Sequence, residues 1–435
     1  MRHEPRRHAA IRTADYVFSQ LIPYLGNKRK LLPLIARGLR RVGDLRHARG
    51  TRRAGEVGGG GGCGSGIFVD LFTGSTVVAR FAKTLGFRVL ANDWEPYSSE
   101  IARGTVALNS APSFEHLGGA ARAFEILNAL PPLRGYVARH LCPESDSAPD
   151  TDDERMFFTR ANGERIDAVR EQLAAWELSR SISEAECAYV LSALLYSVSY
   201  VSNTSGLFKG FHRGWGGATG TALYRIQSAL ALRPPILHDN GAANLALRAD
   251  AQSLASDLRG ILGAAPDVVY IDPPYNQHPY GSNYHVLNTV ALWDKPPVHP
   301  RIRVAGRPLE KSAIRTDWRT LRRSPYNTAR DALPAFRALI AGIDARWILV
   351  SYSTDGNIPL EGLLSALSER GSVSVHPQQY KRYRVSTPRM SPRPHNVEFL
   401  AVLDARGRPM RRGIDELVSR IAAEDADDPV AARRR

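Results

Sequence analysis

The chain has 435 residues, and its content of 43% hydrophobic and 23% charged side chains excludes a wholly disordered protein. Its 58 basic and 43 acidic residues give a net charge of +15, which favours a polyanionic partner, nucleic acid first. No apolar run approaches the roughly 18 residues of a membrane-spanning helix, and the 3 cysteines are too few and too widely spaced for a disulfide framework, so we expect a cytoplasmic protein.

The N-terminal part begins with a basic segment, and we expect residues 1–21 to form a mobile arm. Residues 22–42 predict a turn followed by a helix, because apolar residues recur there at helical spacing. Lys28 follows the glycine of this turn and is a candidate for holding a cofactor carboxylate; the alternative is an ordinary loop lysine. Residues 43–66 are rich in arginine and glycine and predict a flexible loop.

A strand–turn–helix–strand unit follows this loop. The apolar run at 67–72 predicts a buried strand, and residues 73–75 predict a tight turn. Helical periodicity at 76–85 and a second apolar run at 88–93 complete the unit. This pattern is typical of the opening of a nucleotide-binding βαβ fold.

Asp93 ends the second strand of this unit, 23 residues after Asp70. That spacing matches an acid that binds the two ribose hydroxyls of an adenosine cofactor. The turn lacks the GxGxxG pattern of dinucleotide sites, which favours a nucleoside-type cofactor without phosphates. The alternative is an ordinary βαβ unit whose acid is solvated.

The remaining elements predict a mostly parallel α/β sheet that ends in a hairpin. A capping box at Ser183 and Glu186 predicts a helix that runs to about residue 198. Further strands are predicted at 267–271, 347–352, 373–375 and 397–403.

Two loops mix aromatic rings with cations and are candidates for contact with nucleic acid. In the loop at 203–217, the cations are Lys209, His212 and Arg213. In the loop between the last two strands, they are Lys381, Arg382 and Arg384. The alternative for each loop is a packed segment with a solvated rim.

The tetrapeptide Asp272, Pro273, Pro274 and Tyr275 directly follows the strand at 267–271. Two prolines end the strand's hydrogen bonding and fix the backbone at the carboxyl edge of the sheet, where ligands bind in open α/β folds. The carboxylate of Asp272 can accept a hydrogen bond from an exocyclic amine, and the ring of Tyr275 can stack on a base. The alternative is a turn that merely terminates the strand.

The order of lysine motif, glycine turn, long insertion and DPPY resembles the Dam-like class of adenine-N6 DNA methyltransferases. The segment around Asn283 and Tyr284 is similar to the one that follows DPPY in a restriction–modification subgroup of that class. Residues 199–217, 349–356 and 380–384 also resemble this subgroup. The resemblance covers most of residues 22–403.

The resemblance implies a Rossmann-like sheet that binds S-adenosylmethionine and carries an inserted target recognition region. It implies that the methionine moiety of the cofactor meets Tyr24, Gly26 and Lys28. It implies that Asp70, Phe72 and Gly74 line the cofactor cleft, that Asp93 binds the ribose and that Asp250 lies near the cofactor adenine. It also implies a catalytic site formed by Asp272, Pro273, Pro274 and Tyr275, with Asn283 and Tyr284 among the DNA-binding residues.

The chain departs from the family at one position, because Thr76 stands where the family usually has glycine. A β-branched residue avoids positive φ angles, which predicts a right-handed backbone at Thr76. Its hydroxyl is then a candidate cap for the following helix.

The domain organisation that we predict divides the chain after the arm into four parts. They are a cofactor-binding half at 22–110, a target recognition insertion at 111–245, a catalytic half at 246–405 and a charged tail at 406–435.

The predicted function is methyl transfer from S-adenosylmethionine to the exocyclic amine of a flipped adenine in duplex DNA. We expect no metal, because no acid or cysteine completes a zinc- or iron-type set around the histidines. The resemblance implies that the protein acts as a monomer. A cognate restriction endonuclease is an expected partner. The alternatives are an RNA base amino-methyltransferase and a catalytically inactive nucleic-acid-binding protein.

Overall fold

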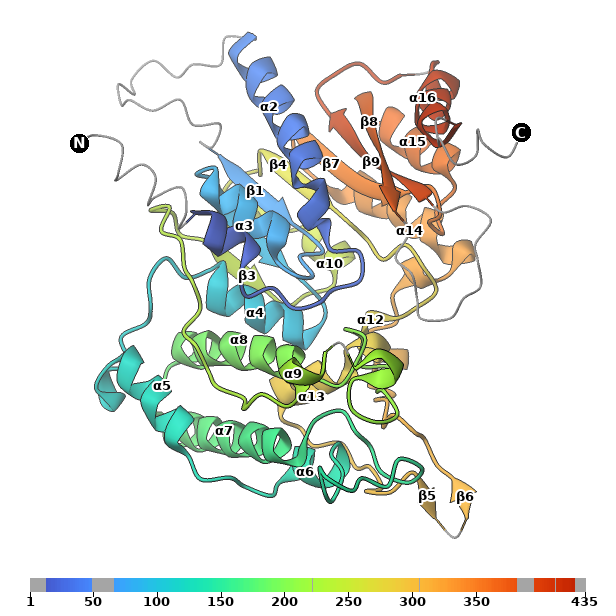
Figure 1. The fold of residues 1–435 in the computed structure, drawn as a ribbon. Coiled ribbons are helices and arrows are strands. Elements are labelled where there is room, and N and C mark those ends of the chain that lie inside the picture. Colours follow the sequence, from blue (N-terminus) through green and yellow to red (C-terminus); the bar gives the residue numbers. More distant parts are fainter. Residues whose placement is uncertain are drawn as a thin grey trace, which may run out of the picture.

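The structure, a computed structural model, describes residues 13–48, 66–220, 222–304, 306–381, 395–410 and 412–426. Its main sheet has seven strands in the order β3-β2-β1-β4-β7-β9-β8 (Figure 1). The first five pair in parallel, whereas β9 is antiparallel to β7 and β8, which confirms the predicted α/β fold and its late hairpin. The strands are β1 (Ile67–Asp70), β2 (Arg88–Asn92), β3 (Leu245–Leu247), β4 (Val268–Ile271), β7 (Trp347–Ser353), β8 (Ser372–Lys381) and β9 (His395–Asp404).

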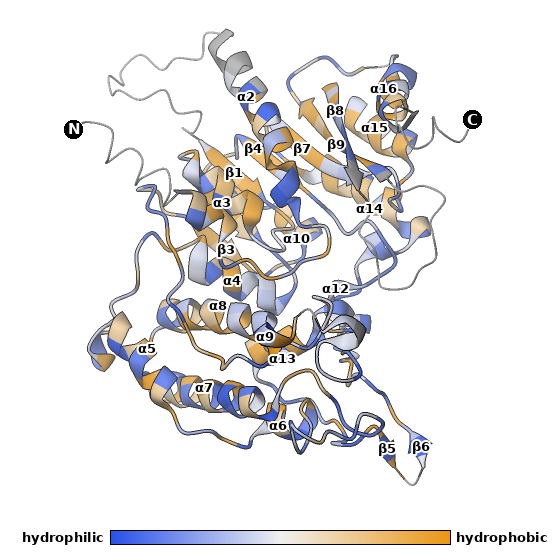
Figure 2. Cartoon of the chain, viewed as in Figure 1, coloured by the Kyte–Doolittle hydropathy of each residue, from blue (hydrophilic) through white to orange (hydrophobic). Residues whose placement is uncertain are grey.

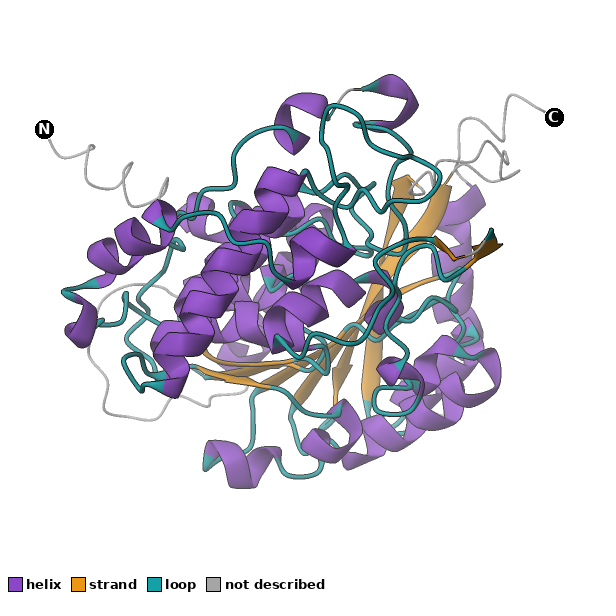
Figure 3. Ribbon diagram, turned by 90° about the horizontal axis from the view of Figure 1, so that it is seen from below, coloured by secondary structure: helices purple, strands orange, loops and turns teal. Residues whose placement is uncertain are grey.

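Helices cover both faces of this sheet, as Figure 3 shows. Successive strand residues point to opposite faces, so Phe68 and Tyr270 pack in one core while Val69 and Val269 pack in the other. The first face is covered by α2 (Leu32–Ala48) and α3 (Val77–Thr84). The second face is covered by α10 (Ala251–Ala255), α11 (Leu258–Leu262), α14 (Ala329–Gly342), α15 (Leu360–Ser368) and α16 (Ile414–Ala426).

A helical lobe lies below the sheet in Figure 1. It comprises α5 (Ala120–Ala129), α6 (Tyr136–His140), α7 (Arg160–Leu178), α8 (Glu184–Val201), α9 (Leu223–Ile226), α12 (Tyr280–Asn283) and α13 (His285–Leu292). The lobe has its own apolar core, which joins Leu194 of α8 to Leu287 of α13, and Figure 2 shows α13 as mainly hydrophobic. Helix α4 (Pro96–Thr105) connects lobe and sheet, because Ile101 packs in the lobe core and Ala102 in the sheet core.

The remaining elements are short. A two-stranded hairpin projects from the lobe in Figure 1. It consists of β5 (Arg303–Val304) and β6 (Arg307–Pro308). The short 3-10 helices are η1 (Lys28–Leu31), η2 (Glu115–Leu117), η3 (Gly217–Thr219), η4 (Asp317–Arg319) and η5 (Pro325–Asn327).

The capping box predicted at Ser183 and Glu186 is confirmed at the start of α8. The hydroxyl of Ser183 accepts a hydrogen bond from the backbone N–H of Glu186, and the Glu186 carboxylate accepts one from the backbone N–H of Ser183. The helix continues to Val201, slightly beyond the predicted end, because Val198 and Val201 are buried in the lobe core.

The prediction for Thr76 is wrong. Its φ is +67°, in the left-handed region, and its side chain makes no capping hydrogen bond. The turn between β1 and α3 imposes this conformation, because the N–H of Thr76 donates to the carbonyl of Thr73 at 2.7 Å while its own carbonyl starts the helix by accepting from Arg80. Thr76 is fully buried, so tertiary packing outweighs the local preference of a β-branched residue.

Two predictions are wrong where the structure describes them. Residues 13–18 of the predicted mobile arm are helical, and Tyr16 and Val17 are buried in the sheet core. Helix α2 continues to Ala48, into the predicted loop at 43–66.

Residues 1–12 of the arm, the core of the Arg- and Gly-rich loop, Arg382 and Arg384 lie outside the described ranges. Among the described residues, none of the helices has the length and apolar character needed to cross a membrane.

Candidate active site

A cleft of about 640 Å³, open to solvent, lies at the carboxyl ends of β1, β2 and β4. Parallel strands end together at this edge, so residues distant in sequence meet there. The lining comprises Tyr24, Phe72, Asp93, Trp94, Glu95, Asp272, Pro273, Pro274, Tyr275, Tyr280, Arg322, Ser324 and Asn327. The structure therefore brings the tetrapeptide together with residues from the lysine motif and from both strands of the βαβ unit.

The tetrapeptide Asp272–Tyr275 leaves the fully buried strand β4, which is hydrogen-bonded on both sides by β1 and β7. Its end is fixed from another part of the chain, because the N–H of Asn357 donates to the carbonyl of Tyr275 at 2.9 Å. The side-chain amide of Asn327 donates to the carbonyl of Asn276 at 2.7 Å. The tetrapeptide is thus held at both ends.

Lys28 contacts the carboxylate of the tetrapeptide. Its Nζ lies 3.0 Å from Asp272 Oδ1 and 3.8 Å from Glu398 Oε2, and the lysine side chain is buried. Burial alone would lower the pKa of Lys28, but attraction to Asp272 and Glu398 outweighs it and raises this pKa well above its usual value. Burial raises the pKa of Asp272 to about 6, and Lys28 limits that rise. Lys28 therefore forms a buried ion pair with Asp272 at the carboxyl end of β4.

Tyr24 and Gly26 shape the wall of the cleft near Tyr275. The ring of Tyr24 stacks against the rings of Tyr280 and Tyr284, with centroid distances of 5.3 Å to each. Those two rings also stack on each other at 6.0 Å, so the three rings form one cluster. The backbone of Gly26 has a φ of +77°, and a Cβ there would lie 3.2 Å from the Tyr275 ring. A glycine is needed at 26 for this close approach.

The glycine turn is bound to Asp93. The N–H of Gly74 donates to Asp93 Oδ2 at 2.8 Å, and the hydroxyl of Ser98 donates to the same oxygen at 2.9 Å. The N–H of Glu95 donates to Asp93 Oδ1 at 2.9 Å. Burial raises the pKa of Asp93, and these hydrogen bonds oppose the rise. Asp93 lines the cleft and also holds the turn against α4.

Asp70 and Asp250 are placed differently from Asp93. Asp70 is 1% exposed, accepts a hydrogen bond from the Thr73 hydroxyl at 3.2 Å and lies beneath the turn. Its burial, together with repulsion from Asp272, raises its pKa to about 8. Asp250 is the N-cap of α10, where its side chain accepts from the N–H of Ser253.

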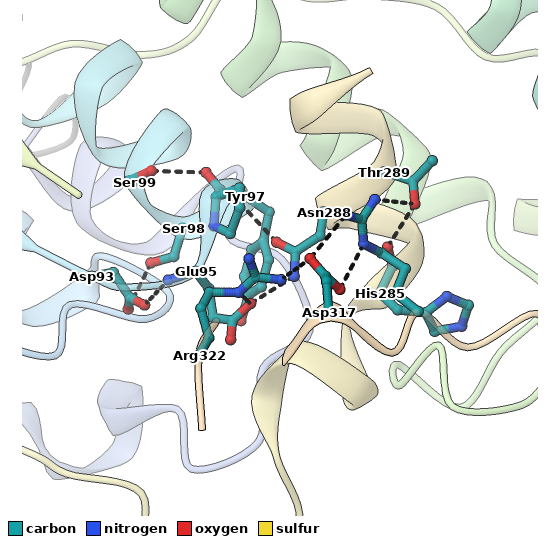
Figure 4. A network of polar contacts seen from close by, with 12 residues as sticks. Asp93, Glu95, Tyr97, Ser98, Ser99, His285, Asn288, Thr289, Asp317 and Arg322 are labelled. Carbon is teal, nitrogen blue, oxygen red and sulfur yellow. Dashed lines mark hydrogen bonds and ion pairs between the residues drawn. The ribbon is translucent and has the colours of Figure 1, made fainter. Parts of the chain in front are cut away.

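A polar network links the cleft to the helical lobe (Figure 4). Asn288 Nδ2 donates to Glu95 Oε2 at 2.6 Å, and Arg322 Nε lies 3.5 Å from the same oxygen. Arg322 and Arg315 both donate to Asp317 Oδ2, at 2.8 and 2.9 Å. Burial raises the pKa of Glu95 to about 7, against the attraction of Arg322. The network holds the segment 315–322 beside the cleft.

The sequence analysis missed several of these residues, namely Glu95, Tyr280, Arg322 and Glu398. Two of them carried a signal. Glu398 is an acid within the apolar run of a predicted strand, and Glu95 follows the predicted ribose acid by two residues. Arg322 had none, because it is brought to the cleft by a segment without any motif.

The candidate DNA-binding residues are separated by the fold. Lys209 and Arg213 are exposed on the loop after α8, and Arg213 forms an ion pair with Asp152. Asn283 and Tyr284 are buried, and Tyr284 accepts a hydrogen bond from the N–H of Leu25 at 2.7 Å. The structure places these two behind the cleft rather than on a DNA-facing surface. His212 is half-buried, and the side chain of Lys381 lies outside the described part.

Comparisons with known proteins identify the family of this chain. A family model described as D12 class N6 adenine-specific DNA methyltransferase matches residues 24–302. The type II methyltransferase M.NlaIII of Neisseria lactamica is 30% identical over 318 residues, which cover 73% of this chain and 84% of that protein. No solved structure gives a significant match.

Two further relatives are longer than this chain. The modification methylase StsI of Streptococcus sanguinis is 29% identical over 83% of this chain and 48% of its own length. The type II methyltransferase M.FokI of Planomicrobium okeanokoites is 31% identical over 73% of this chain and 45% of its own length. The chain thus spans about half the length of these two relatives.

Proposed function

Because the chain belongs to the D12 class of N6 adenine-specific DNA methyltransferases, we propose that it methylates the exocyclic amine of an adenine at a specific site in duplex DNA, with S-adenosylmethionine as methyl donor. The observation that carries this proposal is the single cleft in which Asp272 and Tyr275 face Phe72 and Asp93. One half of the cleft suits a planar base with an amine, and the other half suits an adenosine.

The residues present fit S-adenosylmethionine. The cleft combines apolar ring surface with a few polar groups, as small-molecule sites do. Phe72 and Trp94 offer apolar ring surface, and the carboxylates of Asp93 and Glu95 are acceptors for ribose hydroxyls or an ammonium group. S-adenosylmethionine supplies an electrophilic methyl group when it is bound. We propose these four residues as its principal contacts.

The roles of the tetrapeptide follow from its position. Asp272, whose pKa is about 6, is mostly ionised at neutral pH and therefore accepts a hydrogen bond from the adenine amine. A proline carbonyl is proposed as the second acceptor, and the ring of Tyr275 stacks on the base. Flipping the adenine into the cleft costs roughly a few kcal/mol, which stacking and these hydrogen bonds offset. Positioning and electrostatics then carry the direct transfer.

We propose that the helical lobe is the target recognition region. The exposed cations Lys209 and Arg213, together with the neighbouring His212, are the proposed DNA contacts in the described part of the chain. The run of Lys381, Arg382 and Arg384 is proposed as a second contact from the hairpin loop. The description of the family, N6 adenine-specific DNA methyltransferase, favours DNA over RNA as the substrate.

The wider setting is also proposed from the relatives. M.NlaIII and M.FokI are type II methyltransferases, so we propose that this chain protects DNA as the modification enzyme of a restriction–modification system. We further propose that the chain acts as a monomer in the cytoplasm. Its proposed partner is a cognate restriction endonuclease.

The test is Asp272→Asn, which keeps the side-chain volume but removes the charge that accepts from the amine. We expect methyl transfer to fall by about two to three orders of magnitude, as for other single electrostatic contacts in active sites. The measurement is modification-sensitive long-read sequencing of a methylation-deficient host that expresses each variant. The matched control is Asp344→Asn, an exposed acid that pairs with Arg259.

Calorimetric binding of S-adenosylmethionine and thermal unfolding accompany the sequencing, so that misfolding is recognised. A single DNA motif carrying N6-methyladenine with the wild type and the control, but not with Asp272→Asn, is the expected result. Undiminished methylation by Asp272→Asn would refute the catalytic assignment, and an unmodified genome with the wild type would refute DNA as substrate.

A further inference from the structure

Glu398 is a buried acid that the proposed function leaves without a role. It lies on β9, opposite Ser353, the last residue of β7, and opposite Gln378 of β8. Because β9 runs antiparallel to the other strands, its early residues reach the same sheet edge at which β4 delivers the tetrapeptide. Glu398 is 4% exposed, and burial raises its pKa.

Glu398 faces the catalytic carboxylate across one cation. Lys28 Nζ lies 3.0 Å from Asp272 Oδ1 and 3.8 Å from Glu398 Oε2. The shorter distance is a close ion pair, whereas the longer one is a weaker through-space attraction. The ammonium group is therefore shared unequally between two carboxylates in a buried environment, where such charges interact strongly.

We propose that Glu398 is a positioning residue for methyl transfer. Its carboxylate attracts the Lys28 ammonium group and so weakens the hold of Lys28 on Asp272. Asp272 then remains a strong hydrogen-bond acceptor for the adenine amine. A carboxylate that binds an ammonium group tightly is a weaker acceptor for a further donor. A second carboxylate 3.8 Å from the ammonium group weakens that attraction while keeping Lys28 in place. This inference rests on the proposed function, because the amine is that of the target adenine.

Other titratable groups also lie near Asp272 and affect its pKa. Asp70 of β1, Tyr270 of β4, Tyr280 of α12 and Tyr352 of β7 each interact electrostatically with it. Asp355 interacts with Glu398. These groups stay unchanged when Glu398 alone is replaced, so a changed titration of Asp272 reports the loss of the Glu398 charge.

The variant that tests the proposal is Glu398→Gln, which keeps the size and removes the charge. The negative charge of Glu398 raises the pKa of Asp272, so its loss lowers that pKa. We expect the methyl-transfer rate at neutral pH to fall by roughly tenfold and the acid limb of the rate profile to move to lower pH by up to about one unit. Glu398→Asp, which retains the charge, is expected to recover part of the rate.

The measurements are single-turnover methylation of a duplex carrying the motif found by sequencing, from pH 5 to 9, and a carboxyl ¹³C titration of Asp272 assigned by comparison with Asp272→Asn. The matched control is Glu369→Gln, an exposed acid that pairs with Arg337. A slower rate together with a lower Asp272 midpoint supports the proposal. An unchanged rate, or a slower rate with an unchanged midpoint, overturns it, because the second result indicates a merely structural role.

The carbon titration needs no substrate, so it separates the two proposals. If the wild type methylates no DNA, the proposed function fails, while an unchanged Asp272 midpoint in Glu398→Gln overturns the role of Glu398 independently.

Discussion

Single residues in the cleft are fixed by close contacts that leave little room for substitution. Gly26 meets Tyr275, and Gly74 meets Tyr24, whose Cε1 would lie 2.7 Å from a Cβ added to the glycine. Both glycines also have positive φ angles. The glycines of the lysine motif and of the turn therefore allow two aromatic rings to reach the cleft, in addition to allowing the backbone to turn.

Gly26→Ala tests this role at the residue scale. The added Cβ pushes the Tyr275 ring out of its stacking position, so we expect methyl transfer to fall at least tenfold while the free energy of unfolding falls by only about 1 kcal/mol. Single-turnover rates and urea unfolding measure the two effects.

The control is Gly263→Ala. Gly263 has nearly the same φ, +76°, but no neighbour within 4 Å of the added Cβ. The Gly263→Ala variant should lose a comparable free energy of unfolding and keep the wild-type rate of methyl transfer. If both variants lose activity equally, backbone strain rather than the contact with Tyr275 explains the loss.

At the scale of elements, the sheet and the helical lobe meet through α4 and α8. Gly104 of α4 lies so close to α8 that an added Cβ would be 2.2 Å from the carbonyl oxygen of Ala188. Helix α4 begins just after Asp93 and Glu95, and Ser98 within it donates to Asp93. A shift of α4 is therefore transmitted to the acids of the cleft.

Gly104→Ala forces α4 and α8 apart. We expect a loss of about 1–3 kcal/mol in the free energy of unfolding, as for other overpacked cores, and weaker S-adenosylmethionine binding because Asp93 moves with α4. Urea unfolding and calorimetry check the two effects.

Gly342→Ala is the control for Gly104→Ala, because it adds the same methyl group to a helix where no neighbour lies close. Gly342 ends α14 and has open space at its Cβ position, so the alanine should leave stability unchanged or raise it slightly. Equal stabilities of the two variants would contradict the proposed tight helix contact.

At the scale of the whole molecule, the net charge of +15 is the property that we relate to DNA binding. Duplex DNA releases counterions when basic side chains neutralise its phosphates, so the affinity should fall steeply with salt. The lobe and the sheet both contribute to the cleft, because Tyr280 of α12 lines it together with Asp93, which follows β2.

Arg213→Ala tests the proposed DNA contact by the lobe. If Arg213 neutralises a phosphate, the slope of log K against log salt decreases by about one. Fluorescence titrations with duplex DNA at several salt concentrations measure this slope. Arg337→Ala, an exposed arginine on α14, is the control and should leave the slope unchanged. An unaltered slope with a changed sequence preference would instead indicate that Arg213 reads a base.

Local patterns in the sequence were sufficient for much of the fold. Apolar runs indicated six of the seven strands of the main sheet but missed the short edge strand β3. The capping box determined the start of α8, and the DPPY tetrapeptide indicated the sheet edge on which the candidate site lies. These signals are local, since strand burial, helix capping and proline geometry act within a few residues.

Only the tertiary structure decided the contacts between distant segments. The pairing of Lys28 with Asp272 and Glu398 depends on three elements meeting at one edge, and the left-handed conformation of Thr76 depends on its burial. The burial of Tyr284 and the approach of Arg322 to the cleft depend on how α13 and the following segment pack. Such contacts are set by the balance of burial and charge across the whole chain, which no local pattern records.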